Sequence, residues 1–214
     1  MTTHAHRPRR LRWPLLVTAL ALLSLVCSGC FRSDLDARIS KDGTVRGVFI
    51  LAFSNEILRY AGQDRADVVR EVKAASQSLA PGVRVEVVDD GSYVGERISF
   101  DAIPIEDFGT TIATLARSVG PLGANVAQDF RLEKTKTRWR FFGTMDLSGD
   151  QFAITAADGA DPTLPARTFK MSIRLTFPGR VLARDKAAKV KGRSITWTPK
   201  LGEAMQMQAV ALLA

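Results

Sequence analysis

The chain has 214 residues, of which 46% are hydrophobic and 24% charged, and 30 basic against 22 acidic residues give it a formal net charge of +8. Its two histidines, His4 and His6, and its two cysteines, Cys27 and Cys30, all lie within the first 30 residues. The rest of the chain therefore excludes a Ser-His-Asp triad, a Cys-His catalytic pair, an internal disulfide and any zinc site built on imidazole or thiolate.

The first 29 residues have the pattern of a signal peptide. Arg7, Arg9, Arg10 and Arg12 stand without an acid before an apolar run over residues 15–26. A basic segment before a short apolar run is typical of secretion signals, and this run is shorter than the about 20 residues of a spanning helix. Removal of the signal takes four arginines and no acid, which leaves a net charge of +4 and argues against a nucleic-acid partner.

The residues before Cys30 indicate where the signal is cut. Ser28-Gly29-Cys30 resembles the lipobox of bacterial lipoproteins, although Cys27 stands where leucine is usual. The resemblance implies a signal peptide over residues 1–29 and acyl chains, such as palmitate, on Cys30 as the first mature residue. Ordinary secretion and an uncleaved anchor are the alternatives, and export by the Sec or the twin-arginine route is left open. No second apolar run of spanning length follows, so we expect a lipid anchor at the N-terminus only, on the extracytoplasmic face of the cell membrane.

Alternation and turn residues predict two hairpins and two helices in the first half of the mature chain. Apolar residues alternate with polar ones over 35–39, and Asp42-Gly43 turns the chain into a returning strand over 45–53. Ser54 can cap a short helix to residue 60, and Asp64 can cap a second helix to about residue 79. A second hairpin follows, with strands over 83–88 and 93–100.

The second half predicts one more helix and several strands. Phe108, Ile112, Leu115 and Val119 have helical spacing. Strand patterns follow at 130–133, 139–147, 169–177, 194–198 and 205–212. With about nine strands and two or three helices, residues 30–214 are predicted to form a single α+β domain with a mainly antiparallel, curved sheet. The strand order of the second half is left open.

Several of these features together are similar to the LppM domain of actinobacterial lipoproteins. They are the lipobox cysteine, the first hairpin with Val45-Arg46-Gly47, and the closing segments 175–179 and 194–199. The resemblance implies an α/β lipoprotein domain with an apolar cavity that binds phospholipids or mannosylated phosphatidylinositols of the envelope. It implies no catalytic residue, and only the acylated cysteine has a counterpart of known role, at Cys30.

Three segments carry candidate lipid or membrane contacts. The helix over 108–119 mixes large and small residues, a strand near 139–142 sets aromatic beside basic residues, and six basic residues over 180–193 suit anionic headgroups. The candidate residues are Phe108, Ile112, Leu115, Trp139, Phe141, Arg184, Lys186 and Lys189. The alternatives are a helix that simply packs, a core-facing Trp139 and Phe141 with Arg140 and Phe142 on the opposite face, and a solvated loop or hairpin tip.

These observations favour a membrane-anchored lipoprotein that binds a lipid or glycolipid of the envelope. The alternative is an envelope interaction or scaffold protein without a small-molecule ligand, which predicts an exposed apolar patch. We expect no enzyme activity, cofactor or metal site; the pairs Asp89-Asp90 and Asp158/Asp161 lack the spacing of a calcium loop. A protein partner cannot be named from these residues.

Overall fold

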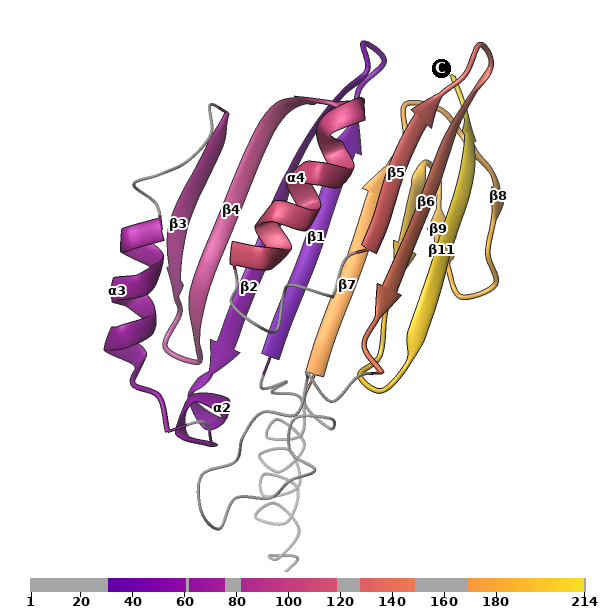
Figure 1. The fold of residues 1–214 in the computed structure, drawn as a ribbon. Coiled ribbons are helices and arrows are strands. Elements are labelled where there is room, and N and C mark those ends of the chain that lie inside the picture. Colours follow the sequence, from indigo (N-terminus) through magenta and orange to yellow (C-terminus); the bar gives the residue numbers. More distant parts are fainter. Residues whose placement is uncertain (1–30, 61, 76–81, 119–127, 149–168, 214) are drawn as a thin grey trace, which may run out of the picture.

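The structure, a computed structural model, describes residues 31–60, 62–75, 82–118, 128–148 and 169–213. These residues form two β-sheets and three helices in two layers (Figure 1). The prediction of an α+β fold with mainly antiparallel strands is confirmed. The predicted signal peptide and Cys30 lie outside the described residues, as does the Asp158/Asp161 pair.

The larger sheet, called sheet A, has seven strands in the order β3-β4-β2-β1-β7-β10-β9. Its strands are β1 (Phe31–Ile39), β2 (Thr44–Ser54), β3 (Val83–Asp89), β4 (Tyr93–Pro104), β7 (Phe169–Thr176), β9 (Lys189–Lys191) and β10 (Ser194–Trp197). Both predicted hairpins, β1–β2 and β3–β4, are present and antiparallel. The pairing of β1 with β7 is parallel, so the first described strand lies beside a strand that begins 138 residues later in the sequence, at Phe169.

The smaller sheet, called sheet B, has four antiparallel strands in the order β5-β6-β11-β8. They are β5 (Gln128–Lys134), β6 (Arg138–Asp146), β8 (Val181–Arg184) and β11 (Ala204–Leu212). β6 alternates between exposed and buried residues, which places Trp139 and Phe141 on the core face and Arg140 and Phe142 on the outer face. That division is the one that the alternation of the sequence predicted.

Two of the three described helices begin at predicted caps. The Ser54 hydroxyl accepts a hydrogen bond of 3.3 Å from the Ile57 amide at the start of α2 (Asn55–Tyr60). The Asp64 carboxylate accepts one of 2.9 Å from the Ala66 amide at the start of α3 (Arg65–Ala75). Each cap satisfies an amide that the first helical turn leaves free. The predicted extension of α3 toward residue 79 lies outside the described residues.

The core lies between sheet A and a second layer made of α3, α4 (Ile105–Ser118) and sheet B (Figure 1). Sheet B packs over β7 and β10, where the rings of Phe141 and Trp197 are 5.3 Å apart between centroids. α4 fits beside β5 because Gly109 has no side chain: a Cβ there would lie 2.0 Å from the carbonyl oxygen of Phe130. The small residue of α4 therefore serves close packing.

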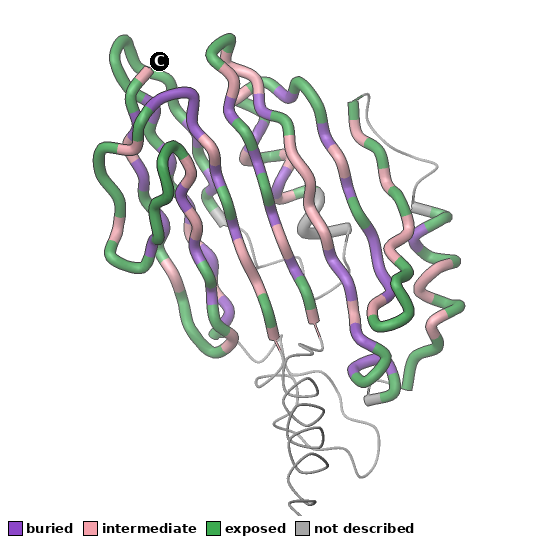
Figure 2. Tube along the Cα trace, turned by 180° about the vertical axis from the view of Figure 1, so that it is seen from behind, coloured by how far each residue is buried: buried purple, intermediate pink, exposed green. Residues whose placement is uncertain are grey.

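The opposite face of sheet A is not covered by any described element (Figure 2). In β1 the buried residues Leu35, Ala37 and Ile39 alternate with Asp34, Asp36 and Arg38, which point to this open face. Because strands alternate their side chains between the two faces of a sheet, the same division continues across the neighbouring strands. The open face of sheet A is therefore a polar surface built on a rigid sheet.

The segment over 180–193, predicted as a loop or hairpin tip, instead contributes two short strands to different sheets, β8 to sheet B and β9 to sheet A. Its one acid, Asp185, holds this crossing. The Asp185 carboxylate accepts hydrogen bonds from the amides of Ala187, Ala188 and Gln208 and from the indole Nε1 of Trp197, at 2.7–3.1 Å. The segment is thus tied to both β10 and β11.

Candidate functional site

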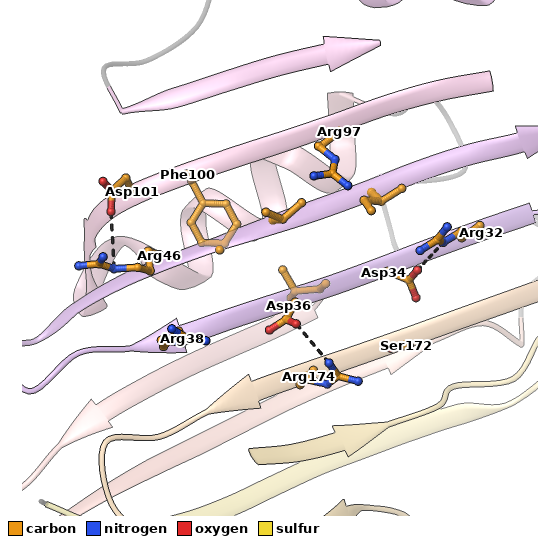
Figure 3. A pocket seen from close by; sticks show the side chains of 14 residues that line it. Arg32, Asp34, Asp36, Arg38, Arg46, Arg97, Phe100, Asp101, Ser172 and Arg174 are labelled. Atoms are coloured by element: carbon orange, nitrogen blue, oxygen red, sulfur yellow. Dashed lines mark hydrogen bonds and ion pairs between the residues drawn. The ribbon is translucent and has the colours of Figure 1, made fainter. Parts of the chain in front are cut away.

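A groove of about 670 Å³ lies on the open face of sheet A, over β4, β2, β1 and β7 (Figure 3). Five arginines and three aspartates line it, together with smaller polar and apolar residues. The charged residues are Arg32, Asp34, Asp36, Arg38, Arg46, Arg97, Asp101 and Arg174. The groove therefore has an excess of two positive charges on strands whose backbone positions are fixed by the sheet.

The aspartates compensate three of the arginines only. Asp34 lies 2.6 Å from the Arg32 guanidinium, Asp36 3.4 Å from that of Arg174, and Asp101 3.7 Å from that of Arg46. These pairs are largely exposed, so each contributes little to stability. Within the described part of the chain, Arg38 and Arg97 have neither an ion pair nor a hydrogen bond to their side chains.

Two aliphatic side chains lie between these charges. Val48 and Ile50 of β2 are half-buried on the open face, directly opposite Asp36 and Asp34 of β1. Arg97 of β4 is in turn opposite Ile50. Arginine side chains beside aliphatic ones suit an amphipathic ligand, since guanidinium groups pair with phosphate or carboxylate while the aliphatic stems and side chains contact carbon.

Two of the three candidate residues of the helix over 108–119 face the core. Phe108 has no exposed surface and Ile112 is 6% exposed, and both belong to the core cluster. Leu115 belongs to α4, but its side chain lies outside the part of the structure that is described. The helix α4, which carries all three residues, covers the other side of sheet A from the groove (Figure 1).

The aromatic candidates of β6 are also internal. Trp139 and Phe141 have no exposed surface, and the ring of Phe141 contacts those of Phe130 and Trp197. The Lys134 ammonium lies 5.3 Å from the centroid of the Trp139 ring. The Trp139 indole nitrogen is buried without a hydrogen-bond partner among the described residues. The aromatic residue that β6 exposes is Phe142, 37% of whose surface is open.

The basic candidates of the crossing segment are exposed but do not converge on one site. Arg184 ends β8 of sheet B, Lys186 lies in the turn that follows, and Lys189 begins β9 of sheet A. Arg184 donates a hydrogen bond to the carbonyl oxygen of Ala188, so it helps to close this turn. Lys189 aligns with Thr196 on the open face of sheet A, at the edge away from the groove.

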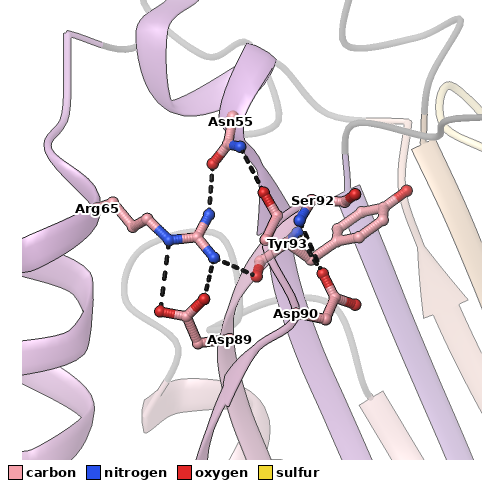
Figure 4. A network of polar contacts seen from close by, with 7 residues as sticks. Asn55, Arg65, Asp89, Asp90, Ser92 and Tyr93 are labelled. Atoms are coloured by element: carbon pink, nitrogen blue, oxygen red, sulfur yellow. Dashed lines mark hydrogen bonds and ion pairs between the residues drawn. The ribbon is translucent and has the colours of Figure 1, made fainter.

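A second polar cluster ties α3 to the β3–β4 hairpin (Figure 4). The Arg65 guanidinium pairs with the Asp89 carboxylate and donates to the Asn55 side chain and, at 3.1 Å, to the carbonyl oxygen of Tyr93. The Arg65 hydrogen bonds lower the pKa of Asp89. Asp90 caps the turn by accepting from the amides of Ser92 and Tyr93, which lowers its pKa as well. Turn and helix contacts account for all of these groups.

One acid on the covered face of sheet A stands apart. Glu96 of β4 is 7% exposed and faces the core side, since its neighbours Val94 and Ile98 in β4 are buried on the same face. No ion pair or hydrogen bond to its carboxyl group is found among the described residues. Burial raises the pKa of Glu96, because a carboxylate is poorly solvated there.

The groove was not among the sites predicted from the sequence. Part of the groove could have been predicted from the sequence. The apolar residues that predicted β1 alternate with four charged ones, Arg32, Asp34, Asp36 and Arg38. The convergence of these residues with Arg97 and Arg174 depends on the β2–β4 and β1–β7 pairings, which join segments far apart in sequence.

The described residues hold no group of three or more His, Cys, Asp or Glu side chains that could bind a metal ion. No helix among those described is both long and apolar enough to cross a membrane.

Comparison with known proteins assigns the chain to a family. The model of the LppM domain matches residues 32–212. Comparison with curated protein sequences gives no significant match. Among solved structures, the NMR structure of the folded domain of Mycobacterium tuberculosis LppM is similar, with a TM-score of 0.56 over 86% of this chain and 91% of that one. At 20% identity this likeness concerns the fold alone. Because the family model spans most of its length, the chain belongs to the LppM domain family.

Proposed function

We propose that this LppM-domain chain is a lipoprotein of the extracytoplasmic face of the cell membrane, anchored through acylated Cys30, and that it binds anionic phospholipids or glycolipids of the envelope. The proposal depends on one observation above all, the groove on the open face of sheet A, in which Arg38 has no acidic partner among the described residues and Arg97 is opposite Glu86 of β3 without forming an ion pair. Guanidinium groups recognise phosphate by paired hydrogen bonds as well as by charge. The ligand part that the groove suits is therefore an anionic headgroup.

The position of the anchor supports the proposal. Phe31, the first residue of β1, directly follows Cys30, so acyl chains on that cysteine would be attached at the end of the central strand of sheet A without a linker. Its ring stacks on that of Phe169 at 4.9 Å and meets that of Phe53 edge-on at 5.5 Å, between centroids. Partly exposed phenylalanine side chains suit burial at the boundary between headgroups and acyl chains. This end of the sheet suits contact with the membrane surface.

The groove also suits an orientation in which the open face of sheet A lies toward the bilayer. Arg38 is six residue steps beyond Arg32 along β1, a length of about 20 Å. If the strands stood upright on the membrane, Arg38 would lie beyond the about 8–10 Å over which surface charge acts at physiological salt. With the open face toward the membrane, all five arginines of the groove reach the headgroup layer.

The apolar cavity predicted from the sequence remains a proposal for the acyl chains. It concerns the covered side of sheet A, where Phe108 and Ile112 of α4 lie in the core. Glu96 faces that side, and burial raises the pKa of its carboxyl group. The proposal that the groove binds the headgroup does not depend on this cavity, because the groove lies on the open face of sheet A.

The scaffold alternative has an observation of its own. Sheet B exposes Phe142 of β6 and Leu212 of β11 on its outer face, 37% and 38% open. The half-buried Val210 of β11 lies on the same face. An exposed apolar patch marks a surface for another protein when it is large and contiguous. Arg138 and Arg140 are paired across the strands with Leu212 and Val210, so charges interrupt this patch. We therefore rank lipid headgroup recognition first.

The test is native mass spectrometry of the full chain, extracted from its own membrane in a neutral detergent. The proposal predicts a covalent acyl modification of the mature N-terminus and a non-covalent anionic lipid at about one per protein. Substitution of Arg97 by Gln is expected to reduce the bound lipid, whereas Arg131→Gln on sheet B is not. A protein that carries no lipid, or only zwitterionic lipid, would contradict the proposal and favour the scaffold function.

A further inference from the structure

A line of side chains crosses five strands of sheet A at the end of β1 that is distant from Cys30. In register across β2, β1, β7, β10 and β9 it consists of Arg46, Arg38, Thr176, Ser194 and Lys191. These five residues are called the Arg38 row. All are exposed or half-buried and lie on the open face, because residues in register on neighbouring strands share a face. The row holds three cations, two hydroxyl groups and no carboxylate.

The two arginines of the row are directly opposite each other. Arg38 and Arg46 are partners in the antiparallel β1–β2 pair, and Figure 3 shows them on neighbouring strands. Like charges in this position repel and destabilise the sheet. Asp101 lies 3.7 Å from Arg46, but the side chains are 58% and 73% exposed, and Arg38 has no partner among the described residues. The repulsion is therefore only weakly compensated.

The adjacent row shows the contrast. Val48, Asp36, Arg174, Thr196 and Lys189 are in register on the same five strands. There the Asp36 carboxylate is opposite Arg174 and accepts its hydrogen bond at 3.4 Å. The adjacent row thus pairs opposite charges within the protein. The Arg38 row places two arginines opposite each other and contains no carboxylate between them.

The hydroxyl groups of the row add hydrogen-bond donors. Thr176 Oγ1 and Ser194 Oγ are 2.8 Å apart, so one hydroxyl donates to the other. The hydroxyl that accepts keeps its own hydrogen for a further acceptor. Both are partly buried beside Arg38, since Thr176 is its partner in the parallel β1–β7 pair. The row can therefore surround an anion with two guanidinium groups on one side and a hydroxyl on the other.

We propose that the Arg38 row is a binding site for a phosphate group, and that its ligand is the phosphate of an anionic lipid headgroup. Phosphate carries several acceptor oxygens and can bridge two guanidinium groups. Bound there, it replaces the repulsion between Arg38 and Arg46 by attraction to both. The choice of a lipid as the source of the phosphate rests on the proposed function; the phosphate site itself does not.

The first experiment follows thermal unfolding of the full chain in neutral detergent at low ionic strength, with and without inorganic phosphate, at matched chloride. Phosphate is expected to raise the Tm of the wild-type chain, because a ligand of the native state stabilises it. Arg38→Gln is expected to raise the Tm without phosphate by about 1–4 °C, because repulsion is removed, and to abolish the phosphate effect. Arg84→Gln, on β3 of the same face but outside the row, should keep the full phosphate effect.

A second variant separates the hydroxyls from the charges. Thr176→Val is expected to weaken phosphate binding about tenfold while leaving the Tm without phosphate below or equal to that of the wild type. The proposal is overturned if Arg38→Gln lowers the Tm or fails to fold, since the pair would then stabilise the sheet. It is also overturned if inorganic phosphate protects Arg38→Gln as strongly as the wild-type chain.

The source of the phosphate is tested with short-chain phosphatidylglycerol beside inorganic phosphate. A lipid ligand predicts that the short-chain lipid gives at least a tenfold lower Kd than phosphate, and that Arg38→Gln removes this advantage. Equal Kd values would assign the site to free phosphate and would overturn the lipid assignment. If the chain carries no lipid from its membrane but phosphate still protects through Arg38, the proposed function fails and the phosphate site stands.

Discussion

The indole Nε1 of Trp197 donates a 2.7 Å hydrogen bond to the carboxylate of Asp185. Trp197 is fully buried in the core, whereas Asp185 lies in the segment that crosses from β8 of sheet B to β9 of sheet A. This contact, with the 2.9 Å hydrogen bond from the Gln208 amide to the same oxygen, joins β10 of sheet A to β11 of sheet B.

Loss of the Asp185 carboxylate should destabilise the fold. Asp185→Ala leaves the buried indole N–H of Trp197 without a partner, which we expect to cost about 1–3 kcal/mol in the free energy of unfolding. Urea unfolding followed by tryptophan fluorescence measures it. Lys186→Gln, next to Asp185 and exposed, is the matched control and should be neutral. Equal stability of Asp185→Ala and the wild-type chain would show that the crossing segment is not held by this carboxylate.

The same carboxylate gives a pH dependence. Burial opposes ionisation of Asp185, but the hydrogen bonds from Gln208, Trp197, Ala187 and Ala188 outweigh it and hold its pKa below the usual range. A carboxyl with a lowered folded pKa stabilises the protein above its unfolded pKa and loses this contribution as the pH falls through the folded value. The stability gap between wild type and Asp185→Ala should therefore be constant at neutral pH and shrink below about pH 4.

Glu96 predicts the opposite sign. Because burial raises its pKa in the folded protein, the unfolded chain ionises first, and folding loses stability as the pH rises from the unfolded pKa through the folded one. Glu96→Gln, which cannot ionise, should have a higher Tm than the wild-type chain at pH 7 and the same Tm below about pH 4. Glu86→Gln, exposed on β3, is the control. A Tm difference that does not change with pH would refute this account of Glu96.

Gly109→Ala tests the packing of α4 against β5. The added methyl group would lie 2.0 Å from the Phe130 carbonyl oxygen, so helix and strand must move apart. We expect a loss of about 1–3 kcal/mol. Thr110→Ala, exposed on the same helix, should be neutral or slightly stabilising. If Gly109→Ala is as stable as Thr110→Ala, then α4 does not approach β5 as closely as the structure places it.

Lipidation is tested at Cys30 directly. Cys30→Ser should leave the unprocessed precursor, without a diacylglyceryl group, in the mass spectrum of the full chain. Cys27→Ser should be processed and acylated like the wild-type chain, because Cys27 lies in the predicted signal peptide, before the predicted cleavage site. A mature Cys30→Ser protein of normal length but without lipid would indicate ordinary secretion instead.

Local patterns were sufficient for the hairpins and helix starts of the first half and insufficient for the site. The Asp42-Gly43 turn and the caps at Ser54 and Asp64 act over a few residues, so alternation and capping predicted both hairpins and the starts of two helices. Long-range pairing has no such local signal. The β1–β7 pair places Arg38 beside Thr176, but no pattern in the sequence around β7 predicts that this strand pairs with β1.

The short strands β8 and β9 were missed for a related reason. Their sequence is rich in lysine and arginine, which usually indicates a solvated loop. The segment is held in place instead by the hydrogen bonds that Asp185 accepts from Trp197 of β10 and Gln208 of β11. The two interpretations of the β6 aromatics were left open by the sequence, because alternation gives two faces without saying which is inside. Burial of Trp139 and Phe141 by sheet A answers that question.

The most direct test of headgroup recognition by the open face of sheet A is binding of residues 31–214, which lack the acylated cysteine, to vesicles. The account predicts at least tenfold tighter binding to vesicles with phosphatidylglycerol than to phosphatidylcholine alone, loss of this difference at high salt, and weaker binding of Arg38→Gln and Arg97→Gln. Binding that is equal on both vesicles, or that falls with Phe142→Ala and Arg140→Gln on sheet B instead, would contradict it.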